Sequence, residues 1–162
     1  MVSMAIAKIG AAPPFFVERG AKISGETYLA HLAHNFFPAM SAIATKKNKL
    51  DTFSFQQDGA TSHGVGAVIR AIKKNTGRPF PFSWPPRSPD VNPLEFYLWG
   101  VMETFIESMG NPPKKESELR TAAHLAADSI DPGELGRAID NVYVRRKKCI
   151  EHDGARFGYA LK

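Results

Sequence analysis

The first quarter of the chain alternates between short apolar segments and turns, and then changes to helical spacing. Residues 1–9 are small and apolar, which is typical of a buried strand, and residues 14–18 form a second apolar segment after a turn that starts at Lys8-Ile9-Gly10. Together they predict a β-hairpin. Ser24 then precedes apolar residues at helical spacing, so we expect it to cap a helix that Pro38 kinks or interrupts.

The middle of the chain predicts a strand followed by a helix. Phe53 and Phe55 alternate with polar residues, and Asp58-Gly59 ends this predicted strand. The apolar positions of the next helix fall on one face, which we expect to be its core face: Val65, Val68, Ile69 and Ile72.

Proline dominates the connection that comes next. Six of the twelve prolines lie between Arg78 and Leu94, a density that excludes a helix and predicts an ordered link from a short strand at residues 81–84. A helix starts after it, with Asn92 suited to the N-cap, Pro93 to the first helical position and Glu95 to the third. Glu95 heads an apolar row of this helix. It is either a capping-box glutamate or an acid with a chemical role.

Two more helices are expected at the C-terminal end. One runs from Glu116 to about Ile130. Its predicted apolar stripe consists of Leu119, Ala123, Ala126 and Ile130. The other begins after Asp131, with Pro132 and Glu134 in the favoured positions of its first turn. We expect it to pack through Leu135, Ile139, Val142 and Cys149.

Asp58 and Glu95 form a candidate metal site. In open α/β sheets ligands bind beyond the carboxyl ends of strands, which is where Asp58 is predicted to lie. The second strand and its proline-rich exit bring Glu95 to the same edge in this interpretation, with the carboxylates ~4–6 Å apart. Two carboxylates that meet there repel each other unless a cation lies between them, and hard divalent ions prefer oxygen ligands.

The two segments that carry these acids, QQDGATSH and WPPRSPDVNPLEFYLWG, resemble the catalytic domain of mariner-superfamily DDE transposases. The resemblance covers nearly the whole chain, and Asp58 matches the second acid of the family and Glu95 the third. Thirty-six residues separate the two acids, slightly more than is usual in the family. His63 matches a histidine of the family motif. It is either a neighbour of the acids or a residue at the start of a helix that bonds the backbone.

The resemblance implies an α/β, ribonuclease-H-like mixed sheet flanked by helices, with further helices at the C-terminal end, over a single domain of residues 1–162. It also implies metal-dependent cleavage and transfer of DNA strands with Mg²⁺ or Mn²⁺, transposon ends and target DNA as partners, a homodimer, and the nucleus as location. In the family the turn of the first hairpin corresponds to Gly10-Ala11-Ala12-Pro13.

The family's first aspartate has no counterpart in this sequence. That aspartate lies on a central strand that would precede Met1, and neither Asp51 nor Glu18 is placed to replace it. We therefore expect a partial catalytic domain without its central strand and without the N-terminal DNA-reading region, and no DNA cleavage by this chain alone. The alternatives are a non-catalytic remnant that binds nucleic acid and a small α/β interaction module.

The composition agrees with a polyanionic partner without requiring one. The net charge is +5 and the pI is about 9.4. Basic residues on two predicted helices, Lys73 with Lys74 and the cluster Arg145, Arg146, Lys147 and Lys148, contact DNA in one interpretation and form solvated surfaces in the other. Lys46-Lys47-Asn48-Lys49 is read as a solvated basic turn.

Other residues argue against a disulfide, a histidine metal site, a phosphate-binding loop and a membrane span. Cys149 is the sole cysteine, which excludes an intrachain disulfide and suits a reducing compartment. His31 and His34 have the spacing of metal ligands but no evident third partner, so packing or surface roles are expected. Gly64-Val65-Gly66 lacks the ending of a phosphate-binding loop. No apolar run has membrane-spanning length, and we expect a soluble intracellular chain.

Overall fold

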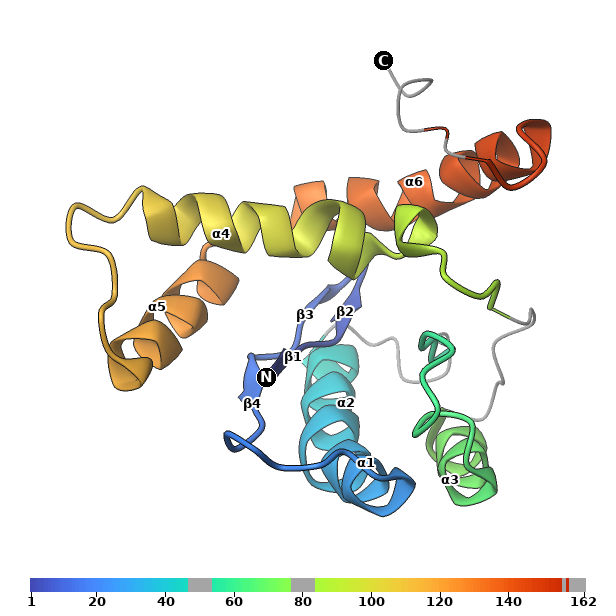
Figure 1. Ribbon diagram of the computed structural model, residues 1–162, viewed down its shortest axis with the longest axis horizontal. Helices are drawn as coiled ribbons and strands as arrows, with labels where there is room; N and C mark the ends of the chain where they lie inside the picture. The colour runs from blue at the N-terminus through green and yellow to red at the C-terminus, as the bar shows by residue number, and fades with distance from the viewer. Residues whose placement is uncertain (47–53, 77–83, 156, 158–162) are drawn as a thin grey trace. The chain divides into compact units, whose positions relative to one another are not determined.

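The computed structural model describes residues 1–46, 54–76, 84–155 and 157, and it shows a mixed α/β chain (Figure 1). The chain divides into two compact units. Unit 1 consists of Met1–Ala5 and Ala11–Arg87, and unit 2 of Ile6–Gly10 and Ser88–Lys162. A single domain over residues 1–162 stays a prediction.

The predicted hairpin is present, but its strands are short and interrupted. Strand β1 (Val2–Ser3) pairs antiparallel with β4 (Phe15–Phe16), and β2 (Ile6–Ala7) pairs with β3 (Gly10–Ala11). The turn is formed by residues 8–9, so the expectation from the family that Gly10 and Ala11 form the turn is wrong. Pro13 and Pro14 have no N–H to donate, which explains why the ladder is interrupted between β3 and β4.

A long helical segment follows, with one wide turn near its middle. Helix α1 (Gly25–His31) starts after Ser24, whose hydroxyl accepts the backbone N–H of Thr27 at 3.2 Å. It continues through the π-helical turn η1 (Leu32–Phe36) into α2 (Phe37–Lys46). The predicted interruption at Pro38 is therefore confirmed, and it takes the form of a π-turn. The wider turn gives room to a proline ring that would otherwise meet the carbonyl of the preceding turn.

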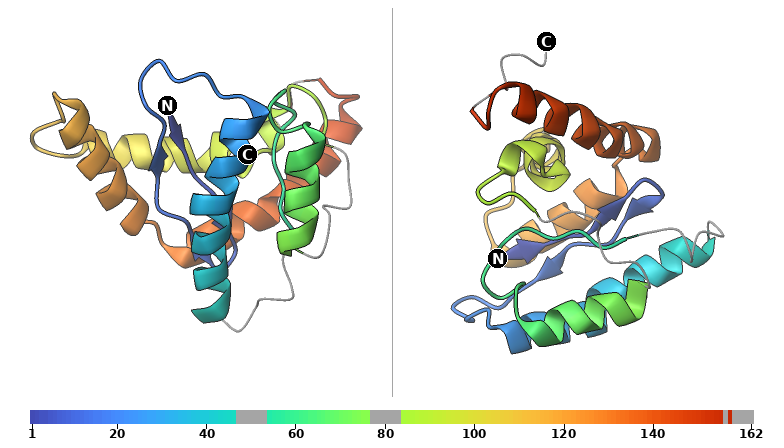
Figure 2. Two further views of the ribbon diagram at one scale, coloured as in Figure 1. Left: turned by 90° about the horizontal axis from the view of Figure 1, so that it is seen from below. Right: turned by 90° about the vertical axis from the view of Figure 1, so that its right-hand side faces the viewer.

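The core of unit 1 lies between these helices, where α3 (Gly66–Thr76) runs beside α1 (Figures 1 and 2). Its buried residues are Tyr28, Leu32, Phe36, Val68 and Ile72. The prediction that Val65 and Ile69 also face the core is wrong, because these side chains are 41% and 54% exposed. Only the row formed by Val68 and Ile72 is buried on α3, so one narrow stripe of this helix packs on the core.

Parts of the predicted strands fall outside the described residues. These are Phe53 and residues 81–83, together with residues 47–49 of the basic turn. Phe55 forms an isolated bridge before the Asp58 loop.

Unit 2 is helical apart from its share of the hairpin. It contains the 3₁₀ turn η2 (Pro89–Val91), the π-helical turn η3 (Leu94–Leu98), α4 (Trp99–Glu107), α5 (Glu116–Asp128) and α6 (Pro132–Glu151). Helix α5 packs against α4, and α6 contacts η2 and β2 (Figure 1). Its core includes Leu98, Met102, Ile130 and Leu135, with a row of small residues on α5, Ala122, Ala123 and Ala126.

The ends of the last two helices agree closely with the sequence. Asp131 caps α6 by accepting the N–H of Glu134 at 2.8 Å, as predicted. Leu119, however, is 44% exposed and does not belong to the buried stripe of α5. It lies in the first turn of α5, before the packed row of alanines begins.

None of the helices in the described part of the chain is long and apolar enough to cross a membrane.

Candidate active site

Asp58 lies in the loop between the Phe55 bridge and α3, and its carboxylate is held through one oxygen. The Oδ1 atom accepts the backbone N–H of Ala60 at 3.0 Å, in the manner of an Asx-turn, and lies 2.7 Å from Nδ1 of His63. A carboxylate only accepts, so the His63 Nδ1 carries the proton of this contact. The side chain of Asp58 is 53% exposed, and Oδ2 has no bonding partner among the described residues.

His63 is held on both of its sides. Its side chain is 19% exposed, and its ring stacks on that of Tyr28 with the centroids 4.0 Å apart and the planes inclined by 30°. The Nδ1 atom also lies 3.3 Å from the backbone carbonyl oxygen of Asp58. Both interpretations of this histidine thus describe real contacts, because it bonds the backbone and touches the acid.

Tyr28 extends these contacts into the core of unit 1. Its hydroxyl donates to Oε1 of Gln57 at 3.0 Å, and Nε2 of Gln57 donates to the backbone carbonyl of His63 at 3.0 Å. Burial raises the pKa of Tyr28, and the negative charge of Asp58 raises it further. Sequence reasoning did not select Tyr28 or Gln57 as site residues. The available signal was an aromatic residue with a polar tip, one turn before Leu32 on the core face of its helix.

Glu95 lies in the first turn of η3 with its side chain exposed. Asn92 caps the helix, since its Oδ1 accepts the N–H of Leu94 at 3.1 Å, while its own N–H donates to the carbonyl of Pro89 at 3.0 Å. The capping-box interpretation of Glu95 therefore finds no support, because the N–H that it would accept is already used. Within the described part of the chain the Glu95 carboxylate makes no hydrogen bond or ion pair.

The segment around Glu95 is fixed from α6 by Arg145. The Nη1 atom of Arg145 donates to the carbonyl of Asp90 at 2.9 Å, and its guanidinium lies over the ring of Phe96, 3.9 Å from the centroid. Burial lowers the pKa of Arg145, and the charge of Asp90 partly offsets this. The side chain thus contacts both flanks of the Glu95 turn within unit 2. A contact of Arg145 with DNA stays a prediction.

The other predicted DNA contacts differ in how available they are. Lys73 and Lys74 are exposed on α3, and Lys147 is exposed on α6. Lys148 is half-buried and pairs with Glu151 at 2.9 Å, and Arg146 is half-buried. Of the basic residues predicted to contact DNA, Lys73, Lys74 and Lys147 are therefore the exposed ones.

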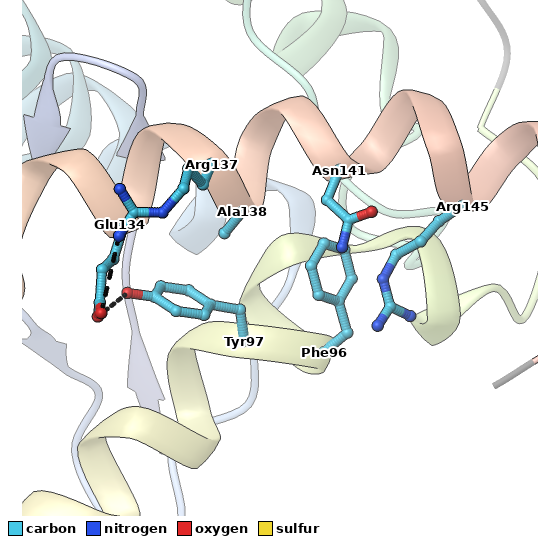
Figure 3. Close-up of a pocket in the computed structure, with 7 residues that line it drawn as sticks. All are labelled: Phe96, Tyr97, Glu134, Arg137, Ala138, Asn141 and Arg145. Atoms are coloured by element: carbon cyan, nitrogen blue, oxygen red, sulfur yellow. Dashed lines mark hydrogen bonds and ion pairs between the residues drawn. The ribbon is translucent and has the colours of Figure 1, made fainter. Parts of the chain in front are cut away.

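An open pocket of about 330 Å³ lies between η3 and α6 (Figure 3). The Tyr97 hydroxyl donates to Oε2 of Glu134 at 3.5 Å at one end, and Arg145 lies beside Phe96 at the other. Burial raises the pKa of Tyr97, and the negative charge of Glu134 raises it further. Sequence reasoning did not predict this pocket, since its lining comes from two helices that are distant in sequence.

The described residues contain no group of three or more histidine, cysteine, aspartate or glutamate side chains that could hold a metal ion. Asp58 belongs to unit 1 and Glu95 to unit 2, and a separation of ~4–6 Å between their carboxylates stays a prediction. Individually the two acids fit a divalent ion, because each has at least one carboxylate oxygen that bonds none of the described residues. His31 and His34 likewise have no third histidine, cysteine, aspartate or glutamate grouped with them among the described residues.

Comparisons with known proteins agree with this assignment of the fold. No model of a known protein family matches the sequence. The chain is 28% identical over 110 residues to the transposable element Tc3 transposase of Caenorhabditis elegans. This match covers 66% of the chain and 32% of the Tc3 transposase. The solved structure of the Mos1 transposase catalytic domain with raltegravir and Mg superposes with a TM-score of 0.81 at 18% identity, over 96% of this chain and 76% of that one.

A second solved structure, the Mos1 mariner paired end complex with Mn, gives a TM-score of 0.78 at 18% identity, over 96% of this chain and 44% of that one. The fold is thus a ribonuclease-H-like α/β fold that matches the fold of the Mos1 catalytic domain. Among solved structures it is similar to that of Mos1, and in sequence the chain resembles the mariner and Tc transposases. The chain spans about a third of the length of the Tc3 transposase.

Proposed function

We propose that this chain is a DDE-type transposase catalytic domain that binds DNA and holds a divalent ion through Asp58 and Glu95. One observation carries the proposal: on a fold similar to that of the Mos1 catalytic domain, Asp58 in QQDGATSH and Glu95 in SPDVNPLE each keep an oxygen available for a metal. The proposed ion is Mg²⁺ or Mn²⁺, since both prefer carboxylate oxygens and the similar Mos1 structures hold these metals.

The residues of the chain would each contribute a separate part of the site. Asp58 would bind the metal through Oδ2 while Oδ1 stays bonded to Ala60 and His63, and Glu95 would bind from the start of η3. Bound divalent ions supply the chemistry that phosphodiester cleavage needs, by lowering the pKa of the attacking water or 3′-hydroxyl and by stabilising the leaving oxygen. No nucleophile from the protein is required.

The proposed partners are transposon ends, target DNA and a second copy of the chain, in line with the paired end complex known for Mos1. Because the proposed substrate is chromosomal DNA, the nucleus is the proposed location. A role in binding nucleic acid without catalysis is the second candidate, and the exposed Lys73 and Lys74 on α3 favour it.

The first test is Mn²⁺ binding, followed through the EPR signal of the free ion. We expect the chain to bind Mn²⁺ and both Asp58→Ala and Glu95→Ala to weaken binding by at least about tenfold, because each removes an oxygen ligand. Glu26→Ala and Glu103→Ala remove exposed acids from the same two units and serve as controls. Equal binding by all five proteins would contradict the proposed metal site.

A further inference from the structure

A chain of contacts connects the carboxylate of Asp58 to the hydrophobic core of unit 1. We call it the Tyr28 network and define it as Tyr28, Gln57 and His63. Tyr28 is 9% exposed and belongs to the buried cluster with Leu32, Phe36, Val68 and Ile72. It is therefore the part of the network with the least freedom to move.

The network reaches His63 by two independent routes. The first is the stack of the Tyr28 ring on the His63 imidazole at 4.0 Å, which fixes the plane of the ring. The second runs from the Tyr28 hydroxyl to Gln57 and from Gln57 Nε2 to the carbonyl of His63, which fixes its backbone. Ring and backbone are thus both held by one buried side chain.

The position of His63 in turn decides which oxygen of Asp58 is available. Its Nδ1–H and the N–H of Ala60 both bond Oδ1, at 2.7 and 3.0 Å. Rotation of the carboxylate would break both bonds, so Oδ2 is kept on the outer side. Metal-binding carboxylates are commonly oriented by such second bonds, and their removal typically costs 10–100-fold in metal affinity.

We propose that Tyr28 is a positioning residue for metal binding: through Gln57 and His63 it holds the Asp58 carboxylate so that Oδ2 alone faces the divalent ion. This inference rests on the proposed role of Asp58 as a metal ligand. It assigns a function to a tyrosine of the core that touches neither the metal nor the substrate.

The test compares the Mn²⁺ affinity of variants of this chain, measured by EPR of the free ion. We expect Tyr28→Leu to weaken Mn²⁺ binding by about tenfold or more, because both routes to His63 are lost. Gln57→Leu should weaken binding by about three- to tenfold, since it removes one route and leaves the stacked ring in place. Tyr28→Phe keeps the stacked ring but loses the hydrogen bond to Gln57, so its Mn²⁺ affinity should be close to that of Gln57→Leu. Met40→Ala removes a buried side chain of α2 that lies outside the cluster of Tyr28, and this variant should bind Mn²⁺ like the wild type.

A second measurement separates positioning from general loss of structure. Because the Tyr28 ring stacks on the His63 imidazole, we expect its ring current to shift the NMR resonance of the His63 Cε1 proton. Wild type and Tyr28→Phe should share this shift, and Tyr28→Leu should lose it. If Tyr28→Leu does not fold, Gln57→Leu and Tyr28→Phe still decide the question. Wild-type affinity in both of them would overturn the inference.

The outcomes also distinguish this inference from the proposed function. Unchanged Mn²⁺ binding by Asp58→Ala would mean that Asp58 is not a ligand, and the proposed function would fail with it. Loss of binding in Asp58→Ala together with normal binding in Tyr28→Leu and Gln57→Leu would leave the ligand in place and refute the Tyr28 network alone.

Discussion

His31 shows how a residue with the spacing of a metal ligand serves the packing of a core. Its ring lies between Phe15 and Phe36, with centroids 5.5 and 4.8 Å away, and both of its nitrogens are used. Nδ1 accepts from the amide of Asn35 at 2.7 Å, which leaves the proton on Nε2, and Nε2 donates to the Ser3 hydroxyl at 2.7 Å. This arrangement matches the neutral ring, since an imidazolium would face a second donor at Asn35.

Burial lowers the pKa of His31 in the folded state, and this predicts how stability depends on pH. An unfolded chain has a histidine pKa near ~6.5, so below that pH it binds more protons than the folded chain. The free energy of unfolding should therefore fall as the pH drops below about 6.5, and level off below the folded pKa. Urea unfolding between about pH 5 and 7.5 measures this slope.

His31→Gln should be less stable than the wild type at pH 7 and should show a flatter dependence on pH. The matched control is His34→Gln, which removes an exposed histidine from the π-turn that directly follows His31 and keeps the contacts of His31. A His31→Gln protein with the wild-type slope would show that another group is responsible.

At the scale of elements, the stability of unit 2 depends on a contact between α6 and the turn that carries Glu95. Arg145 reaches across to the carbonyl of Asp90 and to the ring of Phe96, so one side chain contacts η2 and η3 together. Its Nε is buried and has no hydrogen-bond partner in the part of the chain that the structure describes. The guanidinium is therefore retained in this place by its two contacts with the turn.

We predict that Arg145→Ala lowers the free energy of unfolding by about 1–3 kcal/mol, since a charge-assisted hydrogen bond and a cation–π contact are both lost. Arg145→Lys should recover only a small part, because an ammonium group does not reproduce the planar fork that stacks and donates at once. Lys147→Ala, two residues along α6 and exposed, is the control and should change stability by less than about 0.5 kcal/mol. Chemical denaturation followed by tryptophan fluorescence gives the values. Equal stability of Arg145→Ala and Lys147→Ala would contradict the prediction.

The helices show where sequence patterns were sufficient and where they were not. The caps at Ser24, Asn92 and Asp131 were predictable because each depends on a side chain and an N–H only two or three residues away. The π-turn at Leu32–Phe36 was anticipated only as an interruption at Pro38. Its register depends on how the proline is accommodated, which the spacing of apolar residues does not encode.

The candidate site was predictable to a similar extent. The motifs identified Asp58, Glu95 and His63, but the roles of Tyr28 and Arg145 come from contacts across 35 and 49 or more residues of sequence and from burial. Arg145 in particular belongs to a run of four basic residues, which predicts a charged surface. Only the ring of Phe96 and the carbonyl of Asp90 distinguish it from its neighbours.

At the scale of the whole molecule, the net charge of +5 is the property most relevant to DNA. Lys73 and Lys74 are exposed on α3 in unit 1, and Lys147 is exposed on α6 in unit 2. Basic residues that contact phosphates release the counterions condensed on the DNA, and this makes the affinity for DNA depend on salt concentration.

We predict weak binding to duplex DNA without sequence preference, with an affinity that falls steeply with salt. The double variant Lys73→Ala/Lys74→Ala should reduce the slope of log K against log salt by about 2, and Lys147→Ala should reduce it by about 1. Fluorescence anisotropy with a labelled duplex at several salt concentrations measures the slope. Lys114→Ala/Lys115→Ala removes the same charge from the connection before α5 and should have a smaller effect. If it has the same effect as the α3 variant, the charges act only through the net charge of the chain.

The π-turn at Leu94–Leu98 changes the direction in which Glu95 points relative to the buried face of α4. In an α-helix each residue is fixed at ~100° from the next, so the direction of Glu95 would follow from the positions that α4 buries. Here the N–H of Trp99 bonds the carbonyl of Leu94, one residue further back than in an α-helix, which inserts an extra step between the acid and Met102. The direction of the acid therefore does not follow from the positions that α4 buries. It is set by the π-turn itself, through the bond from Trp99 to Leu94.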